Sequence, residues 1–243
     1  MVSRLLQVNV KVEMKRVITI ITLLFFGCQL AIAQNCNQFV GTVSGKKLTY
    51  LNQDAKGNST GKLIYTATKK DASTVTVHSE VIDKNGKSVG GGDSEIICDG
   101  NAIKIDMKAF VPASSMKQFS NMKMTGDAKY LAYPLNLSVG QKLDDGAVTI
   151  DISNNGQSMS QMQMDIVNRT VEKAESITTN AGSFDCYKIT YDATMKIKMM
   201  GIGIPVHIKA AEWYAPKLGR FVKSETYDKK SKLMGIMVLD AIN

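Results

Sequence analysis

Residues 187–199 read YKITYDATMKIKM, and this stretch decides how the rest of the chain is interpreted. Apolar residues occupy every second position from Tyr187 to Met199, and lysine, threonine or aspartate fills the positions between them. Successive side chains of a strand point to opposite faces, so the alternation predicts one long strand with an apolar and a polar face. Such a strand belongs in an antiparallel sheet, because parallel strands are buried on both faces and read as continuous apolar runs.

The same period of two recurs along most of the chain. Shorter alternating stretches occur at residues 63–67, 75–81, 103–107, 148–152 and 162–166. Clusters of Asp, Asn and Gly separate the stretches and predict hairpin turns at residues 54–57, 83–86, 99–101, 144–146 and 154–156. These patterns predict an all-β protein built from antiparallel strands.

Two further stretches refine this expectation. Residues 233–239 are apolar on both faces, which predicts a strand in a central or covered position. The alternation lapses over residues 109–123, where Pro112 suits the first turn of a helix and Met116 and Phe119 lie three residues apart. We expect a short helix there, lying across the sheet.

The first 33 residues predict a cleaved export leader. A basic start at residues 14–16 precedes an apolar run at residues 17–27, which is too short to span a bilayer. Ala31 and Ala33 then provide the small residues that a signal peptidase needs for a cut before Gln34. We therefore expect an exported protein, periplasmic or extracellular, whose residues 34–243 form a single domain.

An alternative interpretation anchors the chain instead of releasing it. Residues 25–28 read FFGC and can be taken as a lipobox, in which case Cys28 would carry a lipid. A lipidated Cys28 would attach the protein to a membrane without spanning it.

Charge argues against nucleic acid as a partner. The formal net charge is +8, and about +5 is left when the leader is removed. The surplus is spread as single lysines along the expected strands, among them Lys188, Lys196, Lys198 and Lys209, and not as an arginine-rich stripe with aromatics. Solvated strand faces explain this pattern, and it leaves open a peripheral association with an anionic envelope surface. The sequence does not indicate an oligomeric state or a protein partner.

Three cysteines follow the leader, so one thiol is expected to be free. Cys36 lies close to the expected mature N-terminus, where a bridge would tie down a fraying end. We favour a disulfide between Cys36 and Cys98, and the two pairings with Cys186 stay open. The chain has no CxxC motif and no Cys/His cluster, so zinc binding and thioredoxin-like redox chemistry are poorly supported.

Three segments resemble successive landmarks of a known family: residues 133–143 (YPLNLSVGQKL), 181–189 (AGSFDCYKI) and 213–225 (WYAPKLGRFVKSE). They are similar to the TapB-like group, an uncharacterised family of exported bacterial proteins defined by a domain of unknown function. The resemblance covers roughly the C-terminal half. It implies a curved antiparallel sheet or open half-barrel, akin to the periplasmic lipoprotein carriers, and the short helix expected from the residue pattern would lie across that sheet. It implies no reaction.

No catalytic motif fits its context. Residues 57–61 read GNSTG, which matches the GxSxG pattern of a hydrolase nucleophile elbow. An elbow requires a strand before it and a helix after it, whereas here a turn precedes a strand. His78 and His207 alternate with polar residues and are expected at the surface, and the paired carboxylates fall in turns. We therefore predict no catalytic residue, no cofactor and no enzyme activity.

Methionine is in excess, with 14 in the chain. Several methionines fall on apolar strand faces and can fill a core, line a cavity for apolar ligands of variable shape, or, around residues 159–164, hold copper(I). We predict an exported envelope protein that binds a lipid-like or other apolar molecule through Met162, Met164, Tyr191, Met195 and Met199. The alternatives are a structural or envelope-assembly protein with a solid core and, third, methionine-based copper(I) binding.

Overall fold

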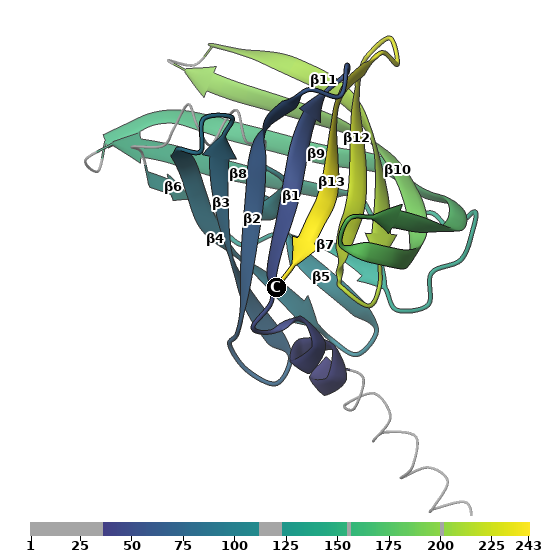
Figure 1. Ribbon diagram of the computed structural model, residues 1–243. Helices are drawn as coiled ribbons and strands as arrows, with labels where there is room; N and C mark the ends of the chain where they lie inside the picture. The colour runs from purple at the N-terminus through teal and green to yellow at the C-terminus, as the bar shows by residue number, and fades with distance from the viewer. Residues whose placement is uncertain (1–35, 112–122, 155–156, 200–201) are drawn as a thin grey trace, which may run out of the picture.

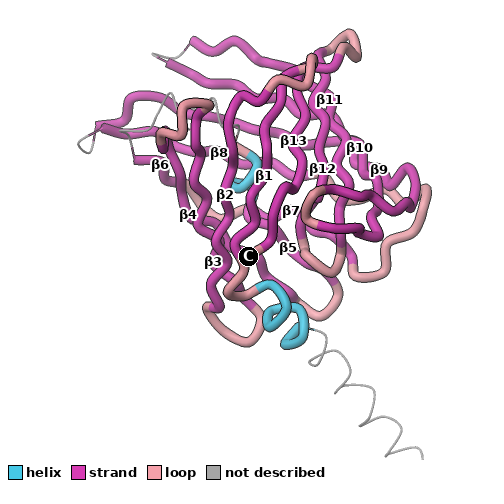
Figure 2. Tube along the Cα trace, in the orientation of Figure 1, coloured by secondary structure: helices cyan, strands magenta, loops and turns pink. Residues whose placement is uncertain are grey.

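Thirteen strands form one antiparallel sheet in the computed structural model, which describes residues 36–111, 123–154, 157–199 and 202–243 (Figures 1 and 2). The strands are β1 (Lys47–Asp54), β2 (Ser59–Lys69), β3 (Thr74–Asp83), β4 (Ser88–Cys98), β5 (Ala102–Asp106), β6 (Lys123–Thr125), β7 (Tyr130–Pro134), β8 (Gly146–Asn154), β9 (Gln157–Thr179), β10 (Gly182–Met199), β11 (Ile202–Ala215), β12 (Arg220–Asp228) and β13 (Leu233–Ile242). Their order across the sheet is β6-β8-β9-β10-β11-β12-β13-β1-β2-β3-β4-β5-β7. The prediction of an all-β, curved antiparallel sheet is confirmed.

The strand with two apolar faces lies at the centre of this order. β13 pairs with β12 on one side and with β1 on the other, which joins the C-terminal and N-terminal halves of the chain. The central position agrees with the expectation from residues 233–239.

The sheet curls until its ends nearly meet, and side chains close the seam. Arg169 on β9 donates from Nη1 to the carbonyl oxygen of Ala132 on β7 at 3.1 Å and to that of Asp144, just before β8, at 2.8 Å. A Cβ placed on Gly146 would lie 2.5 Å from Leu131, so β8 packs tightly against β7. The seam therefore depends on one buried arginine and on close packing at a glycine.

A short helix at residues 36–43 packs at one end of the barrel, which we call the closed end (Figure 1). Val40 and Val43 of this helix are buried, and Phe39 packs so close to Gly219 that a Cβ there would lie 2.5 Å from the phenyl ring. A disulfide between Cys36 and Cys98 ties the helix to the end of β4, as predicted. The helix itself was not anticipated from the sequence.

The opposite end, which we call the open end, carries the turns at residues 55–58, 84–87 and 229–232 and the start of β11 (Figure 1). The 57–61 segment forms the β1–β2 hairpin here, as expected for a turn and not for a nucleophile elbow. A one-turn 3-10 helix, Met107–Phe110, follows β5 with Asp106 as its N-cap. The leader and the helix expected at residues 112–119 lie outside the described residues.

The long β9–β10 hairpin bends over the outer face of the sheet. Its register shifts at Lys188/Ile189 and at Thr190/Asp192, and such bulges bend a strand pair and increase its twist. At the tip, Asn180 donates to the carboxylate of Asp240 on β13 at 2.7 Å. The hairpin therefore covers outward-facing residues of β11, which explains why Trp213 is only 6% exposed.

Candidate functional site

The barrel contains a cavity of about 410 Å³ toward its open end. Seven strands, β2, β3 and β9 to β13, and the 3-10 helix Met107–Phe110 contribute to its wall. Most of the lining side chains are apolar, and two of them, Val206 and Met234, are about half exposed at 48% and 51%. The cavity thus reaches the surface between the starts of β11 and β13.

Three of the five residues predicted to bind a ligand line this cavity. Met164, Tyr191 and Met195 lie in its wall, where Met164 and Met195 are direct cross-strand partners. Met162 lies on the same face of β9 but is completely buried, between Ile150 on β8 and Ile197 on β10. The side chain of Met199 lies outside the described part of the chain.

The wall owes part of its space to two small residues in neighbouring strands. Ala193 on β10 pairs with Ile208, and Ala210 on β11 pairs with Tyr191. Both alanines line the cavity. An alanine side chain ends at Cβ, so these two positions leave room that leucine or phenylalanine would occupy.

One charged group, Glu212 on β11, faces the cavity. Glu212 is 2% exposed and accepts a hydrogen bond from the hydroxyl of Tyr133 at 2.6 Å. Burial raises the pKa of Glu212 above its usual value, although the Tyr133 hydrogen bond and the charges of Arg169 and Arg220 act in the opposite direction. Ser224, its cross-strand partner on β12, also lines the cavity. Glu212 and Ser224 therefore form a polar floor.

Aromatic rings and two buried arginines fill the barrel below this floor. Tyr133 and Tyr214 stack with centroids 4.4 Å apart, and the Arg169 guanidinium lies 4.7 Å from the Tyr133 ring. The Arg220 guanidinium lies 4.1 Å from the ring of Tyr65. Two nitrogens of each arginine are buried without a hydrogen-bond partner among the described residues, so ring contacts replace part of their hydration.

Sequence reasoning missed Glu212, although a signal was present. Residues 210–215 read AAEWYA, and the glutamate is the one charged residue in that apolar run. A lone carboxylate between residues that are buried on both faces of a strand must itself be buried.

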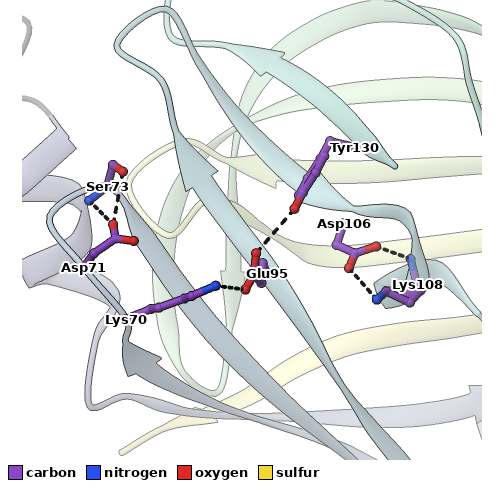
Figure 3. A network of polar contacts seen from close by, with 7 residues as sticks. All are labelled: Lys70, Asp71, Ser73, Glu95, Asp106, Lys108 and Tyr130. Carbon is purple, nitrogen blue, oxygen red and sulfur yellow. Dashed lines mark hydrogen bonds and ion pairs between the residues drawn. The ribbon is translucent and has the colours of Figure 1, made fainter. Parts of the chain in front are cut away.

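Several other carboxylates make structural contacts and do not line the cavity (Figure 3). Glu95 on β4 accepts from Lys70 at 2.6 Å and from the hydroxyl of Tyr130 at 3.4 Å, which links β4 to the end of β2 and to β7. Asp106 accepts from the backbone of Lys108 at 3.0 Å and so begins the 3-10 helix. These contacts hold strands and turns in place.

Both histidines lie on the outer surface. His78 contacts the carboxylate of Asp93 at 2.7 Å, and His207 contacts the hydroxyl of Thr194 at 3.0 Å. His78 and Asp93 are cross-strand partners on β3 and β4, and His207 and Thr194 are partners on β11 and β10. Both histidines are exposed, and neither belongs to the cavity wall.

The methionines proposed to hold copper(I) do not lie on one face. Met159 is three residues from Met162 in β9 and is 48% exposed, whereas Met162 is buried and Met164 lines the cavity. Residues at odd spacing in a strand point to opposite faces. In the described part of the chain, no three His, Cys, Asp or Glu side chains gather in a metal-binding arrangement.

Cys186 is the free cysteine that an odd number of thiols predicted. It is buried on β10, and burial raises the pKa of its thiol to about 11. Its thiolate is therefore scarce at neutral pH, which makes Cys186 a poor nucleophile.

Comparison with known proteins identifies the family to which this fold belongs. A profile of the DUF3108-like family matches residues 43–239. No curated protein matches the chain at a significant level. No helix among the described residues has the length and apolar content needed to cross a bilayer.

Two solved structures share the architecture. A candidate lipoprotein from Parabacteroides distasonis is similar with a TM-score of 0.69 and 25% identity, over 83% of this chain and 96% of that chain. A candidate exported protein with a YmcC-like fold from Bacteroides fragilis is similar with a TM-score of 0.67 and 24% identity, over 82% of this chain and 96% of that one. The expected resemblance to an uncharacterised exported family is confirmed. Because the family profile matches residues 43–239, which is well over half of the sequence, this chain belongs to the DUF3108-like family.

Proposed function

We propose that this is an exported, non-catalytic protein of the cell envelope that binds a lipid-like or other apolar molecule in the barrel cavity. The observation that carries the proposal is the cavity of about 410 Å³ that reaches the surface beside Val206 and Met234. Ligand pockets are typically concave, mostly apolar sites of roughly 300–1,000 Å³. Protein interiors otherwise contain few voids larger than a water molecule, so a purely structural barrel would be expected to fill this space.

The chemistry of the wall supports an apolar chain as the ligand. Met164, Met195 and Met237 line the cavity, and methionine adapts to ligands of different shape because its side chain is flexible and polarisable. Glu212 and Ser224 add polar groups at the deep end. An amphiphile would place its polar group against this floor and its chain toward Val206 and Met234.

The non-catalytic part of the proposal rests on what lies beside the cavity. The groups that commonly transfer protons or attack substrates, the two histidines and the turn carboxylates, lie outside it. Glu212 has the Tyr133 hydroxyl as its hydrogen-bond donor and pairs with Ser224, without a histidine beside it. This arrangement suits binding better than acid–base catalysis.

Export is supported by the two solved relatives, which are described as an exported protein and as a lipoprotein. An exported protein corresponds to cleavage of the leader before Gln34, and a lipoprotein corresponds to a lipid attached to Cys28. N-terminal sequencing and mass spectrometry of the protein purified from its own envelope distinguish them. We expect a free chain that begins at Gln34, and a diacylated Cys28 would establish the anchored form in its place.

The cavity can be tested by filling it. Ala193→Phe places a phenyl ring in the wall, and we expect it to weaken binding of the neutral apolar dye N-phenyl-1-naphthylamine by about tenfold or more. Ala147→Phe, at an exposed position of β8, adds the same ring outside the cavity and should leave binding unchanged. Dye fluorescence titration measures both. If the parent protein binds no dye and no acyl-chain probe, the structural alternative is correct.

A further inference from the structure

The start of β11 presents an apolar face that none of the thirteen described strands covers. β12 ends its pairing with β11 at Ile208, so the preceding residues of β11 pair with β10 and have no strand on their other side. On the inner face of this projecting hairpin, Ile204 is 80% exposed and Val206 is 48% exposed (Figure 1). Met234, at the start of β13, is 51% exposed beside the same mouth.

This apolar face continues into the cavity. The cross-strand row Met164, Met195 and Val206 runs from the cavity wall out to the exposed edge. A neighbouring row leads from buried Met162 through Ile197 to Ile204. Clustered exposed apolar residues at a binding cavity mark a surface that contacts something else.

Lysines surround this apolar face. On the other face of the hairpin, Lys196 pairs with Pro205 and Lys198 pairs with Gly203. The three turns of the open end carry six more lysines, all exposed: Lys56, Lys84, Lys87, Lys229, Lys230 and Lys232. The cationic side chains therefore come from three turns and from the end of β10, all at one end of the barrel.

The aspartates of these turns face their own backbone. Asp54 accepts from the amides of Lys56 and Asn58 at 2.8 and 2.9 Å. Asp83 and Asp228 repeat the arrangement, each accepting from the amides two and four residues later. The three turns therefore contain six lysines and three aspartates, and the aspartate carboxylates point into their own loops. The open end has a net positive charge.

We propose that the open end docks on the surface of an anionic lipid bilayer, with Ile204, Val206 and Met234 reaching below the headgroups and the lysines contacting lipid phosphates. Aliphatic side chains ringed by cations are the composition of interfacial membrane-binding elements. Lysine stems can lie along apolar surface while the ammonium group reaches the headgroups. The docked mouth would open toward the lipids, so an apolar ligand would pass between bilayer and cavity without crossing water.

A lipid surface fits this end better than a protein partner does. Protein interfaces are enriched in aromatic residues, methionine and arginine and are depleted of lysine. Here every cation of the three turns and the hairpin is lysine, and Ile204, Val206 and Met234 include no aromatic side chain.

The closed end supplies matched controls. Val139 is an aliphatic residue 59% exposed, in the loop that follows β7, away from the cavity mouth. Lys142 in the same loop and Lys217 in the β11–β12 turn are exposed lysines. A docking surface restricted to the open end predicts that changes at these three positions have no effect.

Vesicle flotation tests the proposal with protein purified from its own envelope. We expect binding to vesicles of phosphatidylglycerol and phosphatidylcholine, weakened by salt, and little binding to phosphatidylcholine alone. Ile204→Asp, or Lys229→Glu with Lys230→Glu, should weaken binding on the order of tenfold or more, since each cation near an anionic surface contributes about fivefold. Val139→Asp, or Lys142→Glu with Lys217→Glu, should match the parent.

Two results would overturn docking through the open end. One is equal loss of binding for the open-end and closed-end variants, and the other is absence of charge-dependent vesicle binding in the parent. All substituted side chains are at least partly exposed, so circular dichroism should show unchanged folding. Dye binding in the absence of vesicles should also be unchanged in the lysine variants, which separates docking from cavity binding.

Discussion

The two halves of the barrel are built from the same strands, yet one is filled and the other is hollow. In the closed half, Tyr187 and Tyr214 are cross-strand partners, and Tyr133 stacks on Tyr214. Farther along the same pair of strands, Ala210 stands opposite Tyr191 and Ala193 stands opposite Ile208, and the cavity lies there. Smaller side chains along β10 and β11 therefore contribute to the difference between the two halves.

The comparison also separates stability from function. The closed half holds the disulfide, the buried helix residues and the aromatic layer, all of which add contacts that a hollow region lacks. The open half lacks those contacts and contains instead an accessible cavity with exposed apolar residues at its mouth. Substitutions in the closed half should therefore act mainly on the free energy of unfolding, and those in the open half mainly on binding.

Removing the disulfide should have the largest effect on stability. Cys36 and Cys98 are separated by 62 residues, and a bridge that closes a loop of this length is worth about 4 kcal/mol, chiefly through the unfolded chain. We expect Cys36→Ser with Cys98→Ser to lose roughly this free energy of unfolding in urea titrations. Dye affinity in the folded protein should be nearly unchanged, because the cavity lies toward the other end. A loss of dye binding without a loss of stability would contradict the division between the halves.

Met162 on β9 and Met195 on β10 lie on the same face of the sheet but have different surroundings. Met162 is fully buried, so Met162→Ala should cost about 2–5 kcal/mol, as truncations in filled cores do. Met195 lines the cavity, so Met195→Ala should cost less stability while weakening acyl-probe binding. Denaturant unfolding and probe titration on both variants measure the two quantities. Equal stability losses, with no change in probe binding, would indicate that Met195 is ordinary core.

Much of the architecture could be predicted because a strand's period of two fixes which side chains share a face. The alternation at residues 187–199 predicted β10, and the doubly apolar residues 233–239 predicted the central position of β13. The turn residues at 54–57 and 83–86 predicted hairpins that the structure contains. Local patterns were sufficient for these features because each depends on neighbouring residues.

The cavity depends on long-range geometry that the pattern does not contain. Met162 and Met164 were indistinguishable in sequence, yet the curvature of the sheet buries one completely and sets the other in the cavity wall. The bulges near Lys188 and Thr190 and the helix at residues 36–43 also lack a strong local signal. The export leader stays a prediction, since residues 1–35 are outside the described structure.

Glu212 at the boundary between the halves should give the protein a characteristic pH dependence. Burial raises the pKa of Glu212 in the folded state, so the folded protein holds this proton more tightly than the unfolded chain does. As pH rises through the ordinary value of 4.5, the unfolded chain ionises first, which lowers its free energy relative to the folded protein. The stability contributed by the protonated group is therefore lost progressively until pH passes the raised pKa. Relative to Glu212→Gln, the parent should therefore become less stable as pH increases from about 4.

Glu175 on the outer face provides the opposite case. A hydrogen bond from Lys173, followed by one from Trp213, lowers the pKa of Glu175, so its contribution to stability is present above its ordinary value and is lost as pH falls. Because water still reaches the Glu175 carboxylate, whose side chain is 30% exposed, that effect should be small, and the parent should gain stability relative to Glu175→Gln as pH rises. Thermal denaturation followed by circular dichroism across this pH range gives both differences. Parallel pH profiles for the two variants would mean that Glu212 does not carry a desolvated carboxylate at the cavity floor.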